Sequence, residues 1–276
     1  MSSGFASNGL HWQTHAPPRK GNPTILFIHA SWMSSTMWEE TVQILAPRLS
    51  DVNLLRIDLN GHGKTTAGRK EYTLWNQAED VLVVLKELEL SKVIITAISM
   101  GSMIALRLAM LDQPRFVGLV LLASNASAVT EAQRSAFYQL CDIWVAAPAP
   151  SEQIMNAAIL SWGGNPDVDG PRATQIKQDW IHRHSGAENV VPTLNSMMER
   201  DALLDRLGEI HVPVLLIHGE DDKTYPLQDA VDIKERLVNT DVSLEVVNGE
   251  GHLLIQLREA NDVAEWILDF VKRVLG

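Results

Sequence analysis

Several features that mark common protein classes are scarce or missing in this sequence. It has one cysteine, Cys141, so an internal disulfide cannot form and nothing marks the chain as a secreted, disulfide-stabilised protein. Cys141 lies in an apolar stretch, which favours a small packed side chain over a nucleophile. There is no run of about 18 apolar residues that could span a membrane. Residues 1–18 contain no apolar run typical of a signal peptide, and we expect a cytoplasmic protein.

Motifs for cofactors and metals are also missing. Neither a G-x-x-x-x-G-K-S/T phosphate loop nor a G-x-G-x-x-G turn follows a predicted strand, and the sequence has no H-E-x-x-H and no paired C-x-x-C. Basic residues are few, 23 against 34 acidic ones, and the net charge of −11 repels phosphate backbones and anionic lipid. We therefore expect no metal, no cofactor, and neither nucleic acid nor membrane as partner. A small-molecule substrate is the expected partner, bound by a monomer or a homodimer.

What the chain does have is an alternation of short apolar runs with longer amphipathic segments. Its 276 residues, 46% of them hydrophobic, can bury one large core. Residues 36–49 carry an apolar stripe that begins at Trp38, with Thr36 and Glu39 as a capping box. The alternation predicts an α/β fold with a doubly wound, mostly parallel sheet. The predicted strands are 24–28, 53–57, 93–96, 117–122, 212–217 and 242–247, and the predicted helices are 36–49, 74–88, a segment after residue 101 and a segment near 263–274.

This alternation stops between about residues 125 and 211, where no strand is predicted. Helical pieces appear instead, separated by the breakers G-G-N-P at 163–166 and D-G-P at 169–171. A structureless loop of that length is implausible in a compact domain. We predict a helical insertion over the carboxyl edge of the sheet, where ligands bind in open α/β folds. The chain would then consist of a core, 1–124 and 212–276, and a helical cap, 125–211.

One serine stands where a predicted strand turns into a helix. The segment 97–101 reads A-I-S-M-G and places Ser99 directly after the strand. A nucleophile elbow needs small residues two places before and after its serine because the turn is tight, and Ala97 and Gly101 fill those places. The turn would raise the Ser99 hydroxyl at the positive end of the next helix, with the N–H of Met100 directed at a developing oxyanion. The alternative is a serine that only caps the helix.

A serine hydroxyl becomes a nucleophile when a base takes its proton. His252 ends the segment N-G-E-G-H after the last predicted strand, and these glycines let the chain turn sharply and bring the imidazole to the same sheet edge. The alternative is a turn histidine that caps the next helix. The base in turn needs a carboxylate that fixes its tautomer. Glu220, Asp221 and Asp222 crowd the loop after the strand 212–217, and the residues alone leave the choice among them open.

These stretches together resemble the α/β-hydrolase superfamily, in its subgroup of capped esterases and lactonases, and the likeness runs along the whole chain. It implies an α/β-hydrolase fold with nucleophile, acid and base in that chain order. The matching stretches are F-I-H-A-S at 27–31, R-I-D-L-N-G-H-G at 56–63, the elbow at 97–101, the loop 219–226 and G-H at 251–252.

The resemblance also implies an acid and a second oxyanion donor. In the family the acid stands three places after the loop glycine and four before the proline, which corresponds to Asp222. Some relatives carry it after the sixth strand, where this chain has S-N at 124–125. The turn after the first long strand implies the backbone N–H of Ser31 as the second donor, with Trp32 beside the pocket. Ala30 replaces the family's usual glycine, so we expect this turn to differ from the family pattern.

Ser99, His252 and Asp222 with two oxyanion donors suit acyl transfer to water. We therefore predict a serine hydrolase that cleaves a carboxylic ester or lactone of a small, largely apolar molecule through an acyl-enzyme. The C-terminal third resembles enol-lactone hydrolases. Relatives with the same triad leave two alternatives open, a carbon–carbon bond hydrolase of β-diketone-like substrates and a small-molecule receptor. Haloalkane and epoxide enzymes use an aspartate nucleophile, and Ser99 argues against them.

Aromatic and thioether side chains are candidates for an apolar substrate pocket. We expect Trp32, Trp162 and Trp180 to bind substrate. The alternative is that most of these side chains pack the cap against itself. The further candidates are Trp144, Met155, Met197 and Met198.

Overall fold

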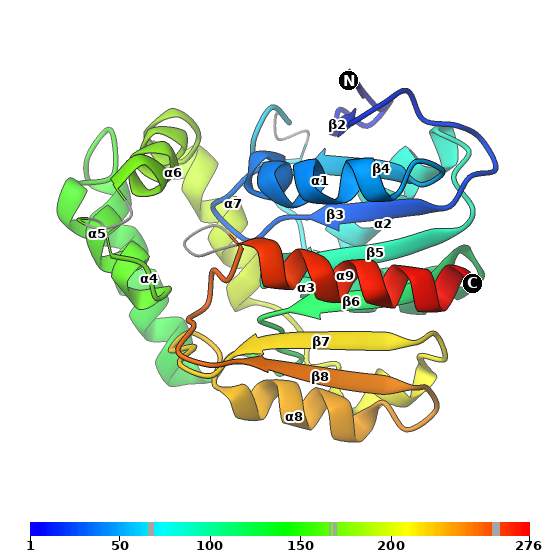
Figure 1. The fold of residues 1–276 in the computed structure, drawn as a ribbon. Coiled ribbons are helices and arrows are strands. Elements are labelled where there is room, and N and C mark those ends of the chain that lie inside the picture. Colours follow the sequence, from blue (N-terminus) through cyan, green and yellow to red (C-terminus); the bar gives the residue numbers. More distant parts are fainter. Residues whose placement is uncertain (66–68, 166, 168–169, 256–259) are drawn as a thin grey trace.

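The structure is a computed structural model that describes residues 1–65, 69–165, 167, 170–255 and 260–276. An eight-stranded sheet lies at its centre (Figure 1). The strands are β1 (Ser2–Phe5), β2 (His11–Thr14), β3 (Thr24–Ile28), β4 (Asn53–Asp58), β5 (Val93–Ile98), β6 (Phe116–Leu122), β7 (Val214–Gly219) and β8 (Val242–Val247). Their order across the sheet is β1-β2-β4-β3-β5-β6-β7-β8.

The sheet is mostly parallel, which confirms the predicted fold class. Strands β4, β3, β5, β6, β7 and β8 pair in parallel in that order. Strands β1 and β2 form an antiparallel hairpin that joins the sheet beside β4, and the sequence analysis did not predict it. Every residue of β3, β4, β5 and β7 is buried, as expected for strands covered on both faces. Strand β8 lies at the opposite edge and is mostly half-buried.

Helices cover both faces of this sheet. They are α1 (Glu39–Leu45), α2 (Leu74–Glu87), α3 (Met100–Leu111), α4 (Glu131–Val145), α5 (Glu152–Ser161), α6 (Gly170–Arg183), α7 (Ala187–Met198), α8 (Leu227–Arg236) and α9 (Ala260–Leu275), with short 3-10 turns η1 (Ser35–Trp38), η2 (Ala46–Arg48), η3 (Gln113–Arg115) and η4 (Leu204–Glu209). In Figure 1, α1 and α9 lie in front of the strands and contact each other, while α2 and α3 pair behind them. The predicted stripe of Trp38, Val42 and Leu45 is fully buried.

The capping box predicted from Thr36 and Glu39 is wrong. Thr36 lies inside the 3-10 turn η1, and α1 begins only at Glu39 without a side-chain cap. The Glu39 carboxylate instead pairs with the guanidinium of Arg56, a buried residue of β4. A charge buried in the sheet needs a counter-charge more than a helix end needs a cap.

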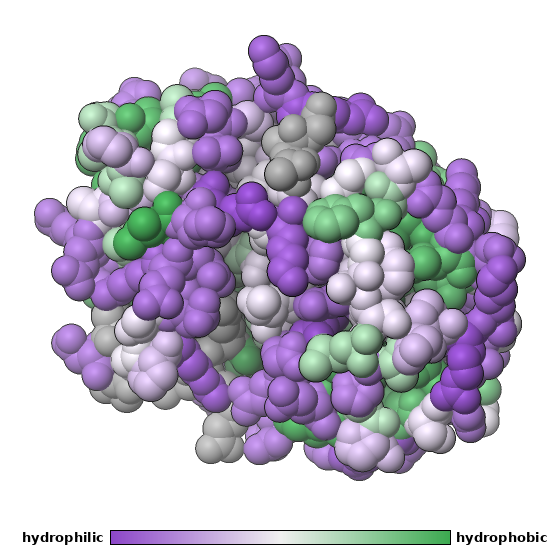
Figure 2. All heavy atoms as spheres, turned by 90° about the horizontal axis from the view of Figure 1, so that it is seen from above, coloured by the Kyte–Doolittle hydropathy of each residue, from purple (hydrophilic) through white to green (hydrophobic). Residues whose placement is uncertain are grey.

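Helices α4 to α7 form the insertion between β6 and β7, which we call the helical insertion. Within the described part of residues 125–211 there is no strand, as the sequence predicts. Helix α4 packs on α7 and α5 on α6, and Figure 1 shows all four beyond the carboxyl ends of the strands. Hydrophilic residues dominate the face shown in Figure 2, with apolar residues in separate patches. None of the described helices combines the length and apolar character needed to cross a bilayer.

Candidate active site

Ser99 stands on a strained turn between β5 and α3. Its φ of 54° and ψ of −120° lie in a region that residues other than glycine rarely adopt. The N–H of Ser99 donates to the carbonyl of Leu122 at 2.9 Å, which ties the turn to the end of β6. A Cβ on Gly101 would stand 2.6 Å from the carbonyl oxygen of Ile28, so glycine is required where α3 crosses β3. The segment therefore adopts the predicted elbow.

Three side chains from distant parts of the chain form one hydrogen-bonded series. His252 Nε2 lies 2.8 Å from Ser99 Oγ, and His252 Nδ1 lies 2.7 Å from Asp222 Oδ2. All three residues are buried. Because a carboxylate only accepts, Nδ1 of His252 donates to it, and Nε2 of the neutral imidazole is left to accept the Ser99 proton.

Asp222 is held as an ionised carboxylate. Burial raises its pKa, but the hydrogen bond and charge of His252 and the N–H of Tyr225 together hold the pKa below its ordinary value. Its Oδ1 accepts from the N–H groups of Thr224 and Tyr225 at 2.8 and 2.9 Å. Glu220 and Asp221 are exposed, so of the three candidate acids Asp222 is the one that contacts the imidazole.

The helical insertion holds the loop that carries His252. The carbonyl of Trp162, at the end of α5, accepts from the N–H groups of His252 and Leu253 at 2.9 and 3.2 Å. Gly163 and Gly251 face each other so closely that a Cβ on Gly163 would lie 2.7 Å from the Gly251 Cα. The position of the imidazole thus depends on contacts from the insertion as well as on the sheet.

The predicted oxyanion donors lie on two backbone segments beside Ser99. Met100 is the first residue of α3, so its N–H belongs to the helix turn that lacks carbonyl partners. Ser31 lines the same cavity as Ser99 and lies in a turn closed by the N–H of Met33 and the carbonyl of Ala30 at 3.3 Å. In this turn the positive φ, 64°, falls on Trp32 and not on Ala30.

Two histidines outside the triad position this turn as neutral acceptors. His62 Nδ1 lies 2.8 Å from the carbonyl of Asn60 and must donate to it, so Nε2 accepts from the N–H of Trp32 at 3.1 Å. In the same way, His29 Nδ1 donates to the carbonyl of Ala30 at 2.7 Å, and its Nε2 accepts from the N–H of Leu59 at 3.0 Å. Burial lowers the pKa of both imidazoles, and that of His62 lies well below its ordinary value.

Two adjoining cavities lie above the triad. Ser99 and His252 open into one of about 330 Å³, whose wall includes Trp32 and Trp162. A second cavity of about 230 Å³ lies within the insertion, where Trp180 contributes to its wall. Both cavities share the side chains of Trp32, Phe137, Ser161, Trp162 and Leu194, so they meet at these residues.

The predicted pocket residues are divided between these cavities and the packing around them. Trp180 is fully buried, and its indole N–H donates to the carbonyl of Trp32 at 2.7 Å. Trp144 and Cys141 line the second cavity, within the insertion, whose wall is mostly apolar. Burial raises the pKa of the Cys141 thiol. Met197 and Met198 line the cavity that contains Ser99, while Met155 is buried in the insertion.

Residues that the sequence analysis did not single out also line the Ser99 cavity. They include two cations, Arg200 and Lys223, and the half-buried ring of Tyr225, which contacts the His252 ring at a centroid distance of 5.1 Å. Nothing in the local sequence marks Arg200, because it stands between Glu199 and Asp201 and reads as a neutralised surface charge. Among the described residues, no three His, Cys, Asp or Glu side chains are grouped so that they could hold a metal ion.

Comparisons with known proteins agree with this architecture. Residues 23–257 match the family model described as alpha/beta hydrolase fold. The chain is 25% identical over 260 residues, 89% of each chain, to a putative 2-succinyl-6-hydroxy-2,4-cyclohexadiene-1-carboxylate synthase of Bacillus subtilis. It is also 25% identical over 244 residues to a pimeloyl-(acyl-carrier protein) methyl ester esterase of Vibrio parahaemolyticus, covering 85% of this chain and 88% of that one.

A solved structure has the same fold at lower sequence identity. The enol-lactonase from Burkholderia xenovorans LB400 superposes with a TM-score of 0.83 at 17% identity, covering 98% of this chain and all of that one. The family match spans most of the chain and includes the described residues Ser99, Asp222 and His252. The chain therefore belongs to the α/β-hydrolase fold family.

Proposed function

We propose that this protein is a serine hydrolase that cleaves a carboxylic ester or lactone of a small, largely apolar molecule. The observation that carries the proposal is the buried series from Ser99 Oγ to His252 to Asp222, with bonds of 2.8 and 2.7 Å. It opens into a cavity large enough for a small ligand. The similarity to an esterase and to an enol-lactonase supports the same class of reaction.

Each group has a defined role in the proposed reaction. Ser99 Oγ attacks the carbonyl carbon while its proton passes to His252 Nε2, and the carbonyl oxygen becomes an oxyanion. Asp222 stabilises the imidazolium that forms. His252 then gives the proton to the leaving oxygen, and the acyl–Ser99 ester remains. A water molecule then attacks this ester while its proton passes to His252. The tetrahedral intermediate collapses, which releases the acid, and His252 returns the proton to Ser99 Oγ.

The N–H groups of Met100 and Ser31 are the proposed oxyanion donors. Both belong to backbone that is fixed before the reaction begins, one by the start of α3 and the other by the turn that His62 holds. Donors that are already in place act most strongly on charge that develops in the transition state. Loss of one such donor typically costs about 2.7–4 kcal/mol of transition-state stabilisation.

The helical insertion, residues 125–211, is proposed to act as a cap over the core formed by 1–124 and 212–276. Its side chains form most of the apolar cavity beside Ser99, where Trp162 and Trp180 offer flat, rigid surfaces. Trp32 extends this wall from the core. An apolar acyl or alcohol group would occupy this cavity while the ester carbonyl lies at Ser99.

Covalent labelling combined with turnover tests the proposal. A fluorophosphonate probe should attach to Ser99 in the wild type, as located by peptide mass spectrometry, and attach to neither Ser99→Ala nor His252→Ala. Chromogenic esters and lactones should be hydrolysed by the wild type, and Ser99→Ala should reduce turnover by about 10⁴- to 10⁶-fold. Ser91→Ala, at an exposed position before β5, is the control for serine loss. Labelling at another residue, or undiminished turnover by Ser99→Ala, would refute the proposed mechanism.

A further inference from the structure

Arg200 brings to the cavity that contains Ser99 a positive charge with no ion pair among the described residues. It stands two residues after the end of α7 and lines this cavity together with Ser99 and His252. Its side chain is half-buried, where a charge loses part of its hydration. In this chain acidic residues outnumber basic ones, 34 to 23. Arg200 forms no ion pair with any residue that the structure describes, so its charge is available to a ligand.

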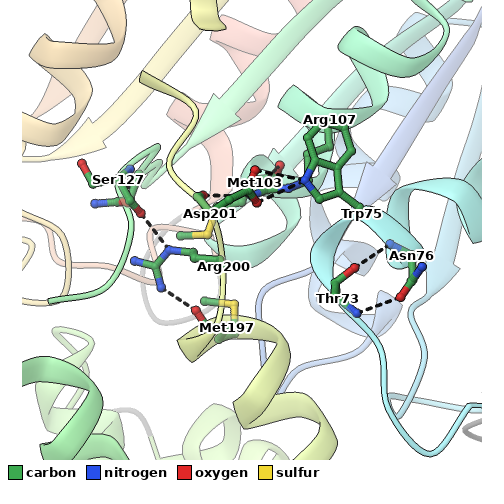
Figure 3. Close-up of polar contacts among 10 residues, drawn as sticks. Thr73, Trp75, Asn76, Met103, Arg107, Ser127, Met197, Arg200 and Asp201 are labelled. Carbon is green, nitrogen blue, oxygen red and sulfur yellow. Dashed lines mark hydrogen bonds and ion pairs between the residues drawn. The ribbon is translucent and has the colours of Figure 1, made fainter. Parts of the chain in front are cut away.

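The two acids beside Arg200 in sequence are engaged elsewhere. Glu199 pairs with Arg134 and accepts from the hydroxyl of Tyr138 at 3.0 Å. Asp201 pairs with Arg107 and accepts from the indole N–H of Trp75 at 3.1 Å. Figure 3 shows Asp201 directed to Arg107 and Trp75, whereas Arg200 points to the opposite side. The fold thus separates Arg200 from both of its neighbouring carboxylates.

Two backbone carbonyls hold the Arg200 guanidinium in place. Nε donates to the carbonyl of Ser127 at 3.0 Å, and Nη1 donates to the carbonyl of Met197 at 2.8 Å (Figure 3). The Ser127 carbonyl is positioned by the neighbouring Asn125, whose Oδ1 accepts from the N–H of Ser127 at 2.8 Å. Carbonyl dipoles orient the guanidinium but do not neutralise it. The remaining N–H groups, on Nη1 and Nη2, are the pair that binds a carboxylate in a bidentate manner.

The other charged groups near Arg200 do not neutralise it. The Arg200 charge acts on Asp229, but that carboxylate bonds to the amide of Asn125 at 2.8 Å and forms no ion pair with the guanidinium. Asp222 is bound to His252. Lys223 is exposed, lines the same cavity and likewise has no ion pair among the described residues, so a second cation adds to the field there. A cavity with two unpaired cations attracts an anion even in an acidic protein.

We infer that Arg200, assisted by Lys223, binds a carboxylate carried by the substrate, so that the preferred substrate is an ester or lactone with an apolar part and a free acid group. This inference rests on the proposed function. The apolar part would lie in the cavity lined by Trp162 and Trp180, and the acid group would lie against the guanidinium. The substrate carbonyl would be placed at Ser99 between these two anchors.

Matched pairs of esters test this inference. Each 4-nitrophenyl half-ester of a linear dicarboxylic acid, from succinic to suberic, is compared with the 4-nitrophenyl ester of the monocarboxylic acid of equal chain length. The wild type should prefer the half-ester at one optimal length. Arg200→Gln should reduce the ratio of kcat/KM values, half-ester over neutral ester, by about 10- to 100-fold, and change kcat/KM for the neutral ester by less than about threefold. Arg200→Lys should restore part of the ratio because it keeps the charge but loses the planar fork.

Arg183→Gln is the matched control. Arg183 also has no ion pair among the described residues, but it ends α6 and lies outside the cavity that contains Ser99. It should leave the ratio unchanged. The inference is overturned if the wild type prefers the neutral ester at every length, or if Arg200→Gln lowers kcat/KM for both esters equally.

Calorimetric binding separates failure of the anion site from failure of the proposed reaction. Ser99→Ala should bind at least one half-ester of the series, and Ser99→Ala with Arg200→Gln should bind the same half-ester at least about tenfold more weakly. If the wild type hydrolyses no ester but this difference in binding is found, the anion site stands and the proposed reaction falls. If esters are hydrolysed but the two variants bind the half-ester equally, the anion site falls and the hydrolase remains.

Discussion

The N–H of Trp32 donates to His62 Nε2 at 3.1 Å, and this bond fixes the turn that contains Ser31, whose N–H is the proposed second oxyanion donor. His62→Ala removes the acceptor and leaves the turn free to move away from the oxyanion. We expect kcat for a chromogenic ester to fall by about 10- to 100-fold with little change in KM, because the bond affects the transition state more than substrate binding. His211→Ala, at an exposed position, is the control. Equal kcat values in His62→Ala and the wild type would show that Ser31 needs no such support.

The choice of acid can be tested with two neighbouring variants. Asp222→Asn keeps the shape of the side chain but can hold His252 in the wrong tautomer, so we expect turnover to fall by about 10⁴-fold. Asp221→Asn changes an exposed carboxylate one residue away and should alter turnover by less than about threefold. Steady-state kinetics of both variants, with circular dichroism to verify folding, checks the assignment. A comparable loss in Asp221→Asn would mean that the charge of the loop matters more than the bond to His252.

The stability of the protein should depend on the protonation of His184. This imidazole is buried against Trp32 and His62, and burial, with smaller effects from the charges of His29 and Arg183, lowers its pKa from 6.5 to about 3. Between these two pH values the unfolded chain binds a proton that the folded protein does not. The free energy of unfolding should therefore decrease as the pH falls through this window, by up to about 1.4 kcal/mol per pH unit for this group.

His184→Phe removes this term and keeps a ring in the same contacts. Because His184 Nδ1 is buried and has no hydrogen-bond partner among the described residues, the substitution should cost little stability at pH 7. Urea unfolding of both proteins at pH 7, 5 and 4 should show a smaller decrease in the free energy of unfolding with falling pH for the variant. Parallel curves would indicate that His184 becomes protonated in the folded state without penalty.

The close contact between α3 and β3 predicts a stability effect at Gly101. A Cβ there would stand 2.6 Å from the carbonyl of Ile28 and 2.8 Å from that of His29, and backbone atoms cannot easily move aside. Gly101→Ala should lower the free energy of unfolding by about 1–3 kcal/mol and also displace Ser99. Gly170→Ala is the control, since a Cβ at the start of α6 would meet no described residue within 4 Å. Equal unfolding midpoints would show that the elbow can adjust to a larger residue.

Much of this architecture could be predicted from the sequence because its signals are local. Strands buried on both faces appear as continuous apolar runs, and the elbow around Ser99 needs small residues at fixed positions. The β1–β2 hairpin was missed because its strands have four residues each and alternate little between polar and apolar. Arg200 was missed for another reason. Its free charge depends on partners of Glu199 and Asp201 that lie 65 and 94 residues away, which no local pattern reveals.

The backbone of Trp32 is hydrogen-bonded from two sides. Its N–H donates to His62 of the core, and its carbonyl accepts from the indole of Trp180 in the insertion. Suppose that residues 125–211 are exchanged for the corresponding segment of another hydrolase to alter substrate range. The exchange would remove the hydrogen bond from Trp180 along with the pocket wall. A chimaera of this kind would need an indole donor at the same place to keep its chemistry intact. The two units are therefore poor candidates for independent transplantation.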